Sequence, residues 1–285
     1  MNSLFKAEAY SPSHITGFFA IFKNGSTGAG LNLEEGVKTK VVIKESRSDK
    51  IIVKLNGKKF PLKTTERVIK KFLSKTRKKF FVTAEHNTKM PFGYGLGLSG
   101  ASALSVSLAL NKALSLKLSK KTCIQIAHDS EVEEKTGLGD VFAEKYSGFL
   151  LGKKPYPSHT AEKISLKEKY VVLAFFNPIE TKKVITSPEK KKLITKFGLK
   201  CMKLFEKEKT IKNFIFLCNY FSTETQLITP RLKKLIHVFP NSSMAMLGET
   251  LFVATNNPIK IKKQLSKYCK NVQCSKIAKK GACLI

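Results

Sequence analysis

The chain has 285 residues, and 52 Lys and Arg against 21 Asp and Glu give a net charge of +31. A hydrophobic fraction of 42% excludes wholesale disorder, and Gly 17 with Pro 10 excludes a collagen-like chain. The charge predicts attraction to polyanions or to small phosphate-bearing molecules, but its excess of Lys over Arg favours a solvated surface over a nucleic-acid binder.

The first half predicts a mixture of strands and helices. Apolar pieces between Glu8 and Ile21 precede residues 24–30, which are too glycine-rich for a regular element. Asn56-Gly57 is a strong hairpin turn signal. Strands are expected at 37–43, 50–55, 58–62, 79–85 and 147–151. Helices are expected at 65–73 and 99–116, and then from a Ser119 cap to about 134.

A Pro-rich connector at 153–159 separates the two halves, so the domains are predicted to be 1–160 and 161–285. The second half predicts strands at 170–176, 251–254 and 271–277. Helices are expected at 188–205, capped by Ser187 with Pro188 in the first turn, and at 211–221, 231–238 and 258–268. A small sheet covered by helices on one face is an α+β plan.

The cysteines and the N-terminus predict the compartment. The six cysteines form no CxxC pair, which argues against structural zinc and favours buried free thiols. Residues 1–10 lack a long apolar run, so no secretory signal is expected and a reducing cytoplasm fits best. The weakly charged stretch 93–111 ends at Lys112, near the lower limit of about 18–20 residues for a membrane span. A buried helix is the better interpretation, and no membrane association is expected.

The glycine-rich run from Pro91 to Ala103 is the most informative segment. Glycines at 93, 95, 97 and 100 expose backbone N–H groups just before a helix N-terminus, a combination that favours phosphate. The run matches GxGxxG, but a second helix follows where a dinucleotide-binding unit needs a strand. No GxxxxGK[ST] occurs, which excludes a Walker A loop. A phosphate cradle is therefore favoured over a plain helix–sheet contact.

A cluster of acidic residues follows the glycine run. His128 and Glu131 share a helix face, and Asp140 comes after a Gly-Leu-Gly turn, so its carboxylate is expected on a bend. Acidic residues are scarce in this chain, and their place after a phosphate cradle suggests a Mg²⁺ ligand with a second functional acid.

Three segments of the chain resemble the GHMP kinase superfamily. The superfamily motif Pro-x-x-x-Gly-Leu-Gly-Ser-Ser-Ala is matched here by Pro91, Gly95, Leu96, Gly97, Ser99 and Ala101, with departures at Leu98 and Gly100. The N-terminal motif is similar to residues 11–15, where His14 replaces the Lys of mevalonate kinases, and the C-terminal motif is similar to residues 246–252. The resemblance implies a left-handed βαβ domain followed by a ferredoxin-like domain, with ATP between them.

Within the superfamily, the chain looks most like the archaeal pantoate kinases. This likeness rests on residues 12–19, 25–30, 91–103, 127–132 and 136–141. It implies ATP-dependent phosphorylation of pantoate to 4-phosphopantoate, a step toward coenzyme A. It leaves room for a homodimer and suggests no nucleic-acid partner.

The resemblance also implies roles for single residues. ATP would be bound by Pro91, Gly93, Gly95, Leu96, Gly97, Ser99, Gly100 and Ala101. Ser99 and Glu131 would hold Mg²⁺, and Asp140 would orient and deprotonate the substrate hydroxyl. Because pantoate is a carboxylate, donors or cations are sought for it, and the candidates are Ser26, His128, Lys153 and Thr181.

Two alternatives stay open at the level of sequence. One is another small-alcohol kinase of the superfamily, acting on homoserine, shikimate or mevalonate. The other is a basic RNA-binding protein, motivated by the +31 charge and by the occurrence of left-handed βαβ plans in ribosomal proteins.

Overall fold

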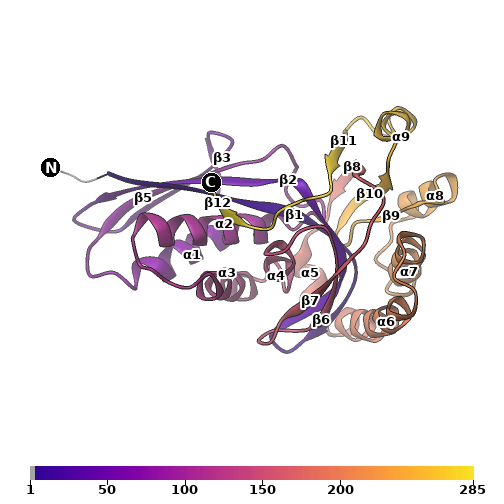
Figure 1. Cartoon of the computed structure of the whole chain (residues 1–285), viewed down its shortest axis with the longest axis horizontal. Coiled ribbons are helices and arrows are strands. Elements are labelled where there is room, and N and C mark those ends of the chain that lie inside the picture. The colour runs from indigo at the N-terminus through magenta and orange to yellow at the C-terminus, as the bar shows by residue number, and fades with distance from the viewer. Residues whose placement is uncertain (1–3) are drawn as a thin grey trace.

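Two β-sheets organise the computed structural model, which describes residues 4–285 (Figure 1). The first sheet has the order β12-β1-β2-β5-β3-β4, with β6 paired to β2 and β7 to β6. Its strands are β1 (Leu4–Phe22), β2 (Gly25–Glu45), β3 (Lys50–Leu55), β4 (Lys58–Lys59), β5 (Phe80–Asn87), β6 (Phe149–Lys154), β7 (Thr160–Ile164) and β12 (Cys283–Leu284). The second sheet is antiparallel, in the order β11 (Val272–Lys276), β8 (Tyr170–Pro178), β10 (Gly248–Thr255) and β9 (Ser242–Met244).

The helices divide between the two sheets (Figure 1). Helices α1 (Lys63–Leu73), α2 (Leu98–Ala113), α3 (Lys120–Glu134) and α4 (Asp140–Glu144) belong to the first half. The second half holds α5 (Thr181–Thr186), α6 (Pro188–Lys207), α7 (Ile211–Glu224), α8 (Pro230–Val238) and α9 (Pro258–Leu265). Strands β3 and β5 are parallel and the chain between them passes through α1, which gives a βαβ unit. The predicted α+β class is confirmed.

Local signals set several helix ends as predicted. The Ser119 side chain accepts a hydrogen bond from the Thr122 N–H, and Ser187 accepts one from the Lys190 N–H with Pro188 in the first turn. Helix α2 is buried nearly all round, because it lies between the first sheet and the other helices. Within residues 4–285, no helix is both long and apolar enough to cross a membrane.

The glycine-rich segment 24–30 is not the loop that its composition predicts, because β2 already begins at Gly25. A Cβ on Gly28 would lie 2.1 Å from the Phe18 carbonyl oxygen, and one on Gly30 would lie 2.2 Å from that of Ile15. These glycines therefore permit close contact with β1. Strand β1 is likewise continuous, and its irregularities between Ser11 and Ser13 and between Thr16 and Phe18 adjust its pairing with β2.

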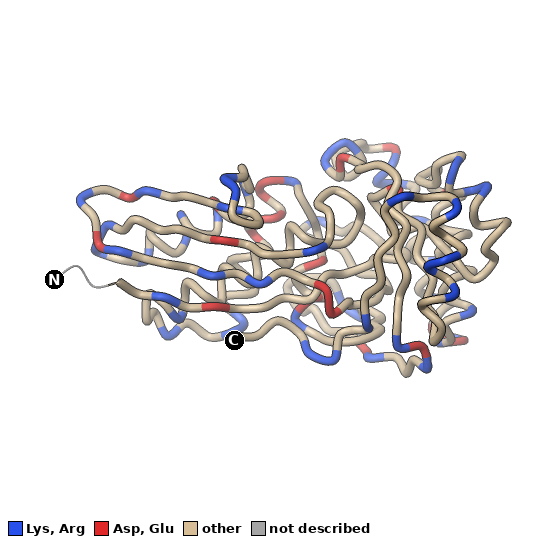
Figure 2. Tube along the Cα trace, turned by 90° about the horizontal axis from the view of Figure 1, so that it is seen from above, with Lys and Arg blue, Asp and Glu red and all other residues tan. Residues whose placement is uncertain are grey.

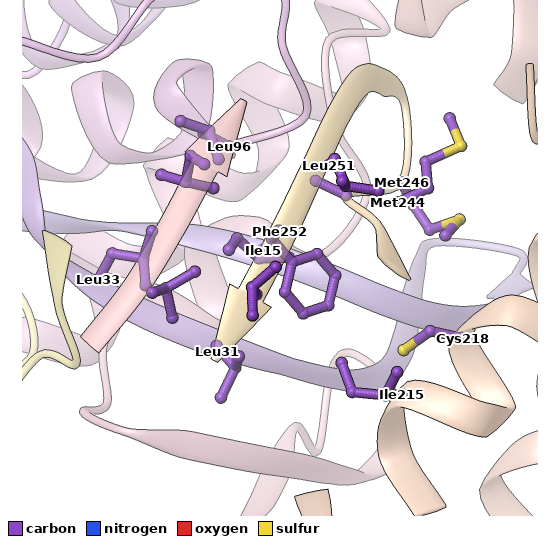
Figure 3. Close-up of a cluster of buried hydrophobic side chains, with 14 of the residues drawn as sticks. Ile15, Leu31, Leu33, Leu96, Ile215, Cys218, Met244, Met246, Leu251 and Phe252 are labelled. Carbon is purple, nitrogen blue, oxygen red and sulfur yellow. The ribbon is translucent and has the colours of Figure 1, made fainter. Parts of the chain in front are cut away.

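One of the two hydrophobic clusters of residues 4–285 joins the end of the first sheet to the second sheet (Figure 3), and the other lies between the first sheet and its helices. Ile15 and Leu31 from the first sheet share the first of these clusters with Leu251 and Phe252 of β10. The Phe18 ring lies 5.8 Å from that of Phe214 in α7, measured between centroids. The division at residue 160 stays a prediction, and in the structure Thr160 begins β7, which pairs with β6.

Cationic side chains are spread along the whole molecule (Figure 2). Lys and Arg occur on the first sheet and on the helices of the second half alike. The six cysteines are free, and Cys123, Cys201, Cys218 and Cys269 are buried, as the sequence predicts.

Candidate active site

A cavity of about 490 Å³ lies where the two halves meet. Six parts of the chain line it: β1 with the start of β2, Lys63 at the start of α1, the glycine run, residues 134–140, residues 179–185 and residues 246–247. Asp140 and Ser99 face the same cavity as Gly93, Gly95 and Gly97. The fold thus brings together the three sequence segments that carry the resemblance.

The glycine run adopts a backbone that other residues rarely adopt. Gly93, Gly95 and Gly97 have φ of 86°, 76° and 62°. A Cβ on Gly95 would also lie 2.7 Å from the Met246 carbonyl oxygen. Gly97 is the N-cap of α2, so the unpaired N–H groups of the first helical turn border the cavity. This geometry suits phosphate oxygens.

Neighbouring segments hold the glycine run in place. The Ile179 N–H donates to the Gly93 carbonyl over 3.0 Å, and the His14 N–H donates to the Leu96 carbonyl over 2.9 Å. The Thr250 hydroxyl donates to the Tyr94 carbonyl over 2.8 Å. Position 248 must be glycine for this contact, because a Cβ on Gly248 would lie 2.0 Å from the Tyr94 carbonyl carbon.

The residues expected to bind ATP divide into two groups. Gly93, Gly95, Leu96, Gly97 and Ser99 line the cavity. Pro91, Gly100 and Ala101 lie outside its lining, and Gly100 and Ala101 are buried in the first turn of α2.

Glu131 on α3 is a buried carboxylate whose oxygens make no hydrogen bond of regular geometry. Burial, reinforced by the charge of Asp140, raises its pKa well above the ordinary range, while the nearby Ser99 hydroxyl and Val141 N–H act in the opposite direction. A Cβ on Gly137 would lie 2.6 Å from Glu131 Oε1, so a larger residue there would displace the Glu131 carboxylate. The Ser99 hydroxyl lies 3.3 Å from that of Thr64, to which it donates.

Ser99 and Glu131 fit a Mg²⁺ ion bound together with nucleotide. Among residues 4–285, no cluster of three or more His, Cys, Asp or Glu side chains could hold a metal alone. Mg²⁺ characteristically takes one or two carboxylates and completes its shell with water and substrate phosphates. Glu131 itself is not part of the cavity lining, but its carboxylate lies behind the glycine run, where a Cβ on Gly100 would be 3.1 Å from Oε2.

Asp140 begins α4 directly after Gly139, so its carboxylate is at a helix start and not on a free bend. The Thr16 hydroxyl donates to its Oδ1 over 3.4 Å. Burial raises the pKa of Asp140, while the nearby His14 and the Thr16 hydrogen bond act in the opposite direction.

Glu144, at the end of α4, is a third buried carboxylate that the sequence analysis missed. Both of its oxygens lack partners, and burial raises its pKa well above the ordinary range, with the charge of Asp140 adding to the effect. A Cβ on Gly97 would lie 2.7 Å from Glu144 Oε1. Predicting the short helix α4 from the sequence would have placed Glu144 one helical turn after Asp140.

Two of the four substrate candidates line the cavity. Ser26 does so from β2, rather than from a loop, and Thr181 does so from the start of α5. His128 lies outside the lining, and its Nε2 is 2.9 Å from the Asn24 carbonyl oxygen. Lys153 is also outside, paired with Glu162 at 2.7 Å. The lysines that do line the cavity are Lys63, Lys135 and Lys182, which the sequence analysis did not select.

Comparisons with known proteins agree with this geometry. Residues 63–148 match the family described as GHMP kinases N terminal domain. The chain is 35% identical to a pantoate kinase of Methanocaldococcus jannaschii over 257 residues, 85% of this chain and 90% of that protein. It is 31% identical to a pantoate kinase of Thermococcus kodakarensis, over 86% of both chains.

Solved structures share the fold. A protein described as a phosphotransferase related to the CoA biosynthesis pathway superposes with a TM-score of 0.87 at 25% identity, covering 98% of both chains. The mevalonate diphosphate decarboxylase of Enterococcus faecalis superposes with a TM-score of 0.71 at 16% identity, covering 99% of both chains. This chain therefore belongs to the GHMP kinase superfamily and, within it, to the family of the archaeal pantoate kinases.

Proposed function

We propose that this protein transfers the γ-phosphoryl group of ATP to pantoate, forming 4-phosphopantoate on the route to coenzyme A. One observation carries the proposal: the glycine run and α2 N-terminus face the same cavity as the Asp140 carboxylate. Phosphoryl transfer requires mainly positioning and charge stabilisation, and this cavity offers both. The choice of pantoate as the substrate is based on the relatives named pantoate kinase.

Different groups of the chain would bind the phosphates, hold Mg²⁺ and receive the substrate proton. Residues 93–99 would hold the phosphates through backbone N–H groups at the helix start. Ser99 and Glu131 would hold Mg²⁺, which neutralises phosphate charge when bound. Asp140 would orient the substrate hydroxyl and receive its proton, while Thr16 fixes one of the carboxylate oxygens.

The substrate carboxylate needs donors in the cavity lining besides the N–H groups of the glycine run. Ser26 and Thr181 offer hydroxyl groups, and Lys135 and Lys182 add positive charge in the same lining. Phe19 and Ile185 line the same cavity and offer apolar surface to the methyl groups of pantoate. Charged donors of this kind favour an acid over a neutral alcohol.

A panel of alcohols tests the proposal. ADP formation and phosphorylated product would be measured with pantoate, homoserine, shikimate and mevalonate at equal concentrations. We expect turnover with pantoate to exceed turnover with the others by at least about 100-fold, since a site built for polar groups rejects analogues strongly. Preferential turnover of homoserine would contradict the choice of substrate while leaving the kinase assignment intact.

A further inference from the structure

His14 and Asn32 form a buried polar pair next to Asp140. They are directly opposite each other on β1 and β2, and their side chains meet with 2.7 Å between His14 Nδ1 and Asn32 Oδ1. Asn32 is fully buried, and His14 is 6% exposed. A buried polar pair is retained only where its hydrogen bonds are satisfied.

The hydrogen bonds of Asn32 fix the proton on His14. Asn32 Nδ2 donates to the carbonyl oxygens of Ala143 and Tyr146, over 2.8 and 2.9 Å. Carbonyl oxygens only accept, so this atom must be the amide nitrogen and the atom facing His14 must be the amide oxygen. His14 therefore carries its hydrogen on Nδ1, which leaves a lone pair on Nε2 in the neutral ring.

The same two bonds anchor the helix that carries Asp140. Ala143 lies near the end of α4 and Tyr146 just beyond it, while Asp140 is its first residue. A helix of five residues has little stability of its own. Asn32 thus ties both the orientation of His14 and the position of α4 to the centre of β2.

His14 and Asp140 border the same space. A Cβ on Gly30 would lie 2.6 Å from His14 Nε2, so this edge of the ring packs over a glycine. His14 and Asp140 line both the main cavity and a side cavity of about 40 Å³. Their Cβ atoms also flank Gly97, where an added Cβ would lie 3.3 Å from each.

We propose that His14, oriented by Asn32, is a positioning residue for Asp140. This inference rests on the proposed function of Asp140. In the reaction, the substrate oxygen keeps the electron pair of its O–H bond and attacks the γ-phosphorus, whose bond to the bridging oxygen of ADP breaks. The proton passes to Asp140, and the resulting O–H group is held by the Nε2 lone pair of His14.

Two substitutions of His14 test the contributions of its two ring nitrogens separately. An Asn side chain places its amide nitrogen near the Nδ1 position, so His14→Asn keeps the bond to Asn32 and loses Nε2. A Gln side chain reaches the Nε2 position, so His14→Gln keeps a polar group beside Asp140. We expect kcat to fall about 100-fold in His14→Asn and less than about 5-fold in His14→Gln, with the KM for ATP within about twofold in both.

A double-mutant cycle supplies the second measurement. If His14 acts through Asp140, adding His14→Asn to Asp140→Asn should lower kcat by less than about twofold further. Circular dichroism melting of each variant gives the folded fraction for correcting the rates. His237→Asn, on α8 and remote from the cavity, is the matched control.

Defined outcomes overturn the proposal. Wild-type kcat in His14→Asn would show that His14 only satisfies Asn32. Multiplicative losses in the double variant would show that His14 does not act through Asp140. The wild type is assayed first with the alcohol panel, so absence of pantoate turnover contradicts the substrate alone. In that case the double-mutant cycle is measured with the alcohol that the wild type phosphorylates, or with ATP hydrolysis if it phosphorylates none of them.

Discussion

The acidic residues of this chain occupy two contrasting environments. On the surface, Glu162 and Glu206 pair with Lys153 and Lys209, and hydrogen bonds from these lysines lower the pKa of both carboxylates. In the interior, Glu131 and Glu144 are fully buried and Asp140 is partly buried at the cavity, and burial raises the pKa of all three.

The contrast is informative because cations are abundant. The chain carries 52 Lys and Arg, yet none of the ion pairs in residues 4–285 involves the three interior acids. Buried ionisable groups without a charge partner cost stability, and their pKa values are shifted most at functional sites. The surface acids follow the ordinary rules of solvated ion pairs, whereas the interior acids gather beside the site that we propose for ATP and substrate.

The largest expected effect is on the interior acid that faces the cavity. Asp140→Asn keeps the shape of the side chain but removes its charge and basicity, so kcat should fall by about 10²–10⁴-fold. The affinity for ATP should change little, because the glycine run remains intact. Single-turnover phosphorylation and nucleotide titration on one preparation measure both.

The matched surface variant is Asp49→Asn, which removes the partner of Lys79 far from the cavity. It should leave kcat within about twofold. Wild-type turnover in Asp140→Asn would end its catalytic assignment, and a fall in Mg·ATP affinity rescued by added Mg²⁺ would make it a metal ligand instead.

The second effect concerns the contact between the glycine run and the interior acids. Gly97→Ala introduces a Cβ at φ 62°, 2.7 Å from Glu144 Oε1 and 3.3 Å from Asp140 Cβ. Displacing these carboxylates and the loop should lower kcat/KM for ATP by at least about 10-fold.

Gly57→Ala is the control for backbone strain alone. Gly57 has φ 81°, and an added Cβ would meet no atom within 4 Å. It should lose about 1 kcal/mol of stability at unchanged kcat/KM. Equal kinetic losses in the two variants, after correction for folded protein, would show that crowding at Gly97 is unimportant.

Some of this site could be predicted from sequence because its signals are local. The spacing of Gly93, Gly95 and Gly97 before an apolar helix encodes both the turn and the cradle. The capping serines at 119 and 187 work in the same way, since their bonds span three residues.

Other parts of the site depend on contacts between distant segments. Asn32 meets a helix more than a hundred positions away, and no periodicity connects them. The composition around Gly28 and Gly30 predicts a loop, because it cannot show that another strand lies against them. The sequence predicts Lys153 as a substrate group, because its surface partners, Glu162 and Glu206, lie elsewhere in the chain.

The third prediction uses pH to distinguish the two environments. The folded-state pKa of Glu144 is raised, so the folded protein binds a proton more tightly than the unfolded chain. Its contribution to stability is therefore complete below the ordinary Glu range and declines as pH rises through the folded-state pKa. The Tm of Glu144→Gln minus the Tm of the wild type should therefore be about 2–5 °C larger at pH 8 than at pH 5.

Glu189→Gln, at an exposed position in the first turn of α6, is the control and should follow the wild type at both pH values. A Tm difference between Glu144→Gln and wild type that stays constant from pH 5 to pH 8 would show that Glu144 does not bind its proton more tightly on folding.

The smallest effect is expected at Lys153, where the sequence and the structure disagree. As a substrate group, its loss would raise the KM for pantoate at least about 10-fold. Lys153 instead lies outside the cavity, between Glu162 and Glu206 on the surface. Lys153→Gln should therefore leave the KM within about twofold and cost about 0.5–1 kcal/mol of stability, as a partly exposed ion-pair network does. High salt should remove that stability difference, because it screens the surface pairs but leaves the interior acids untouched. A KM that rises at unchanged stability would return Lys153 to the substrate site and require this surface network to open when substrate binds.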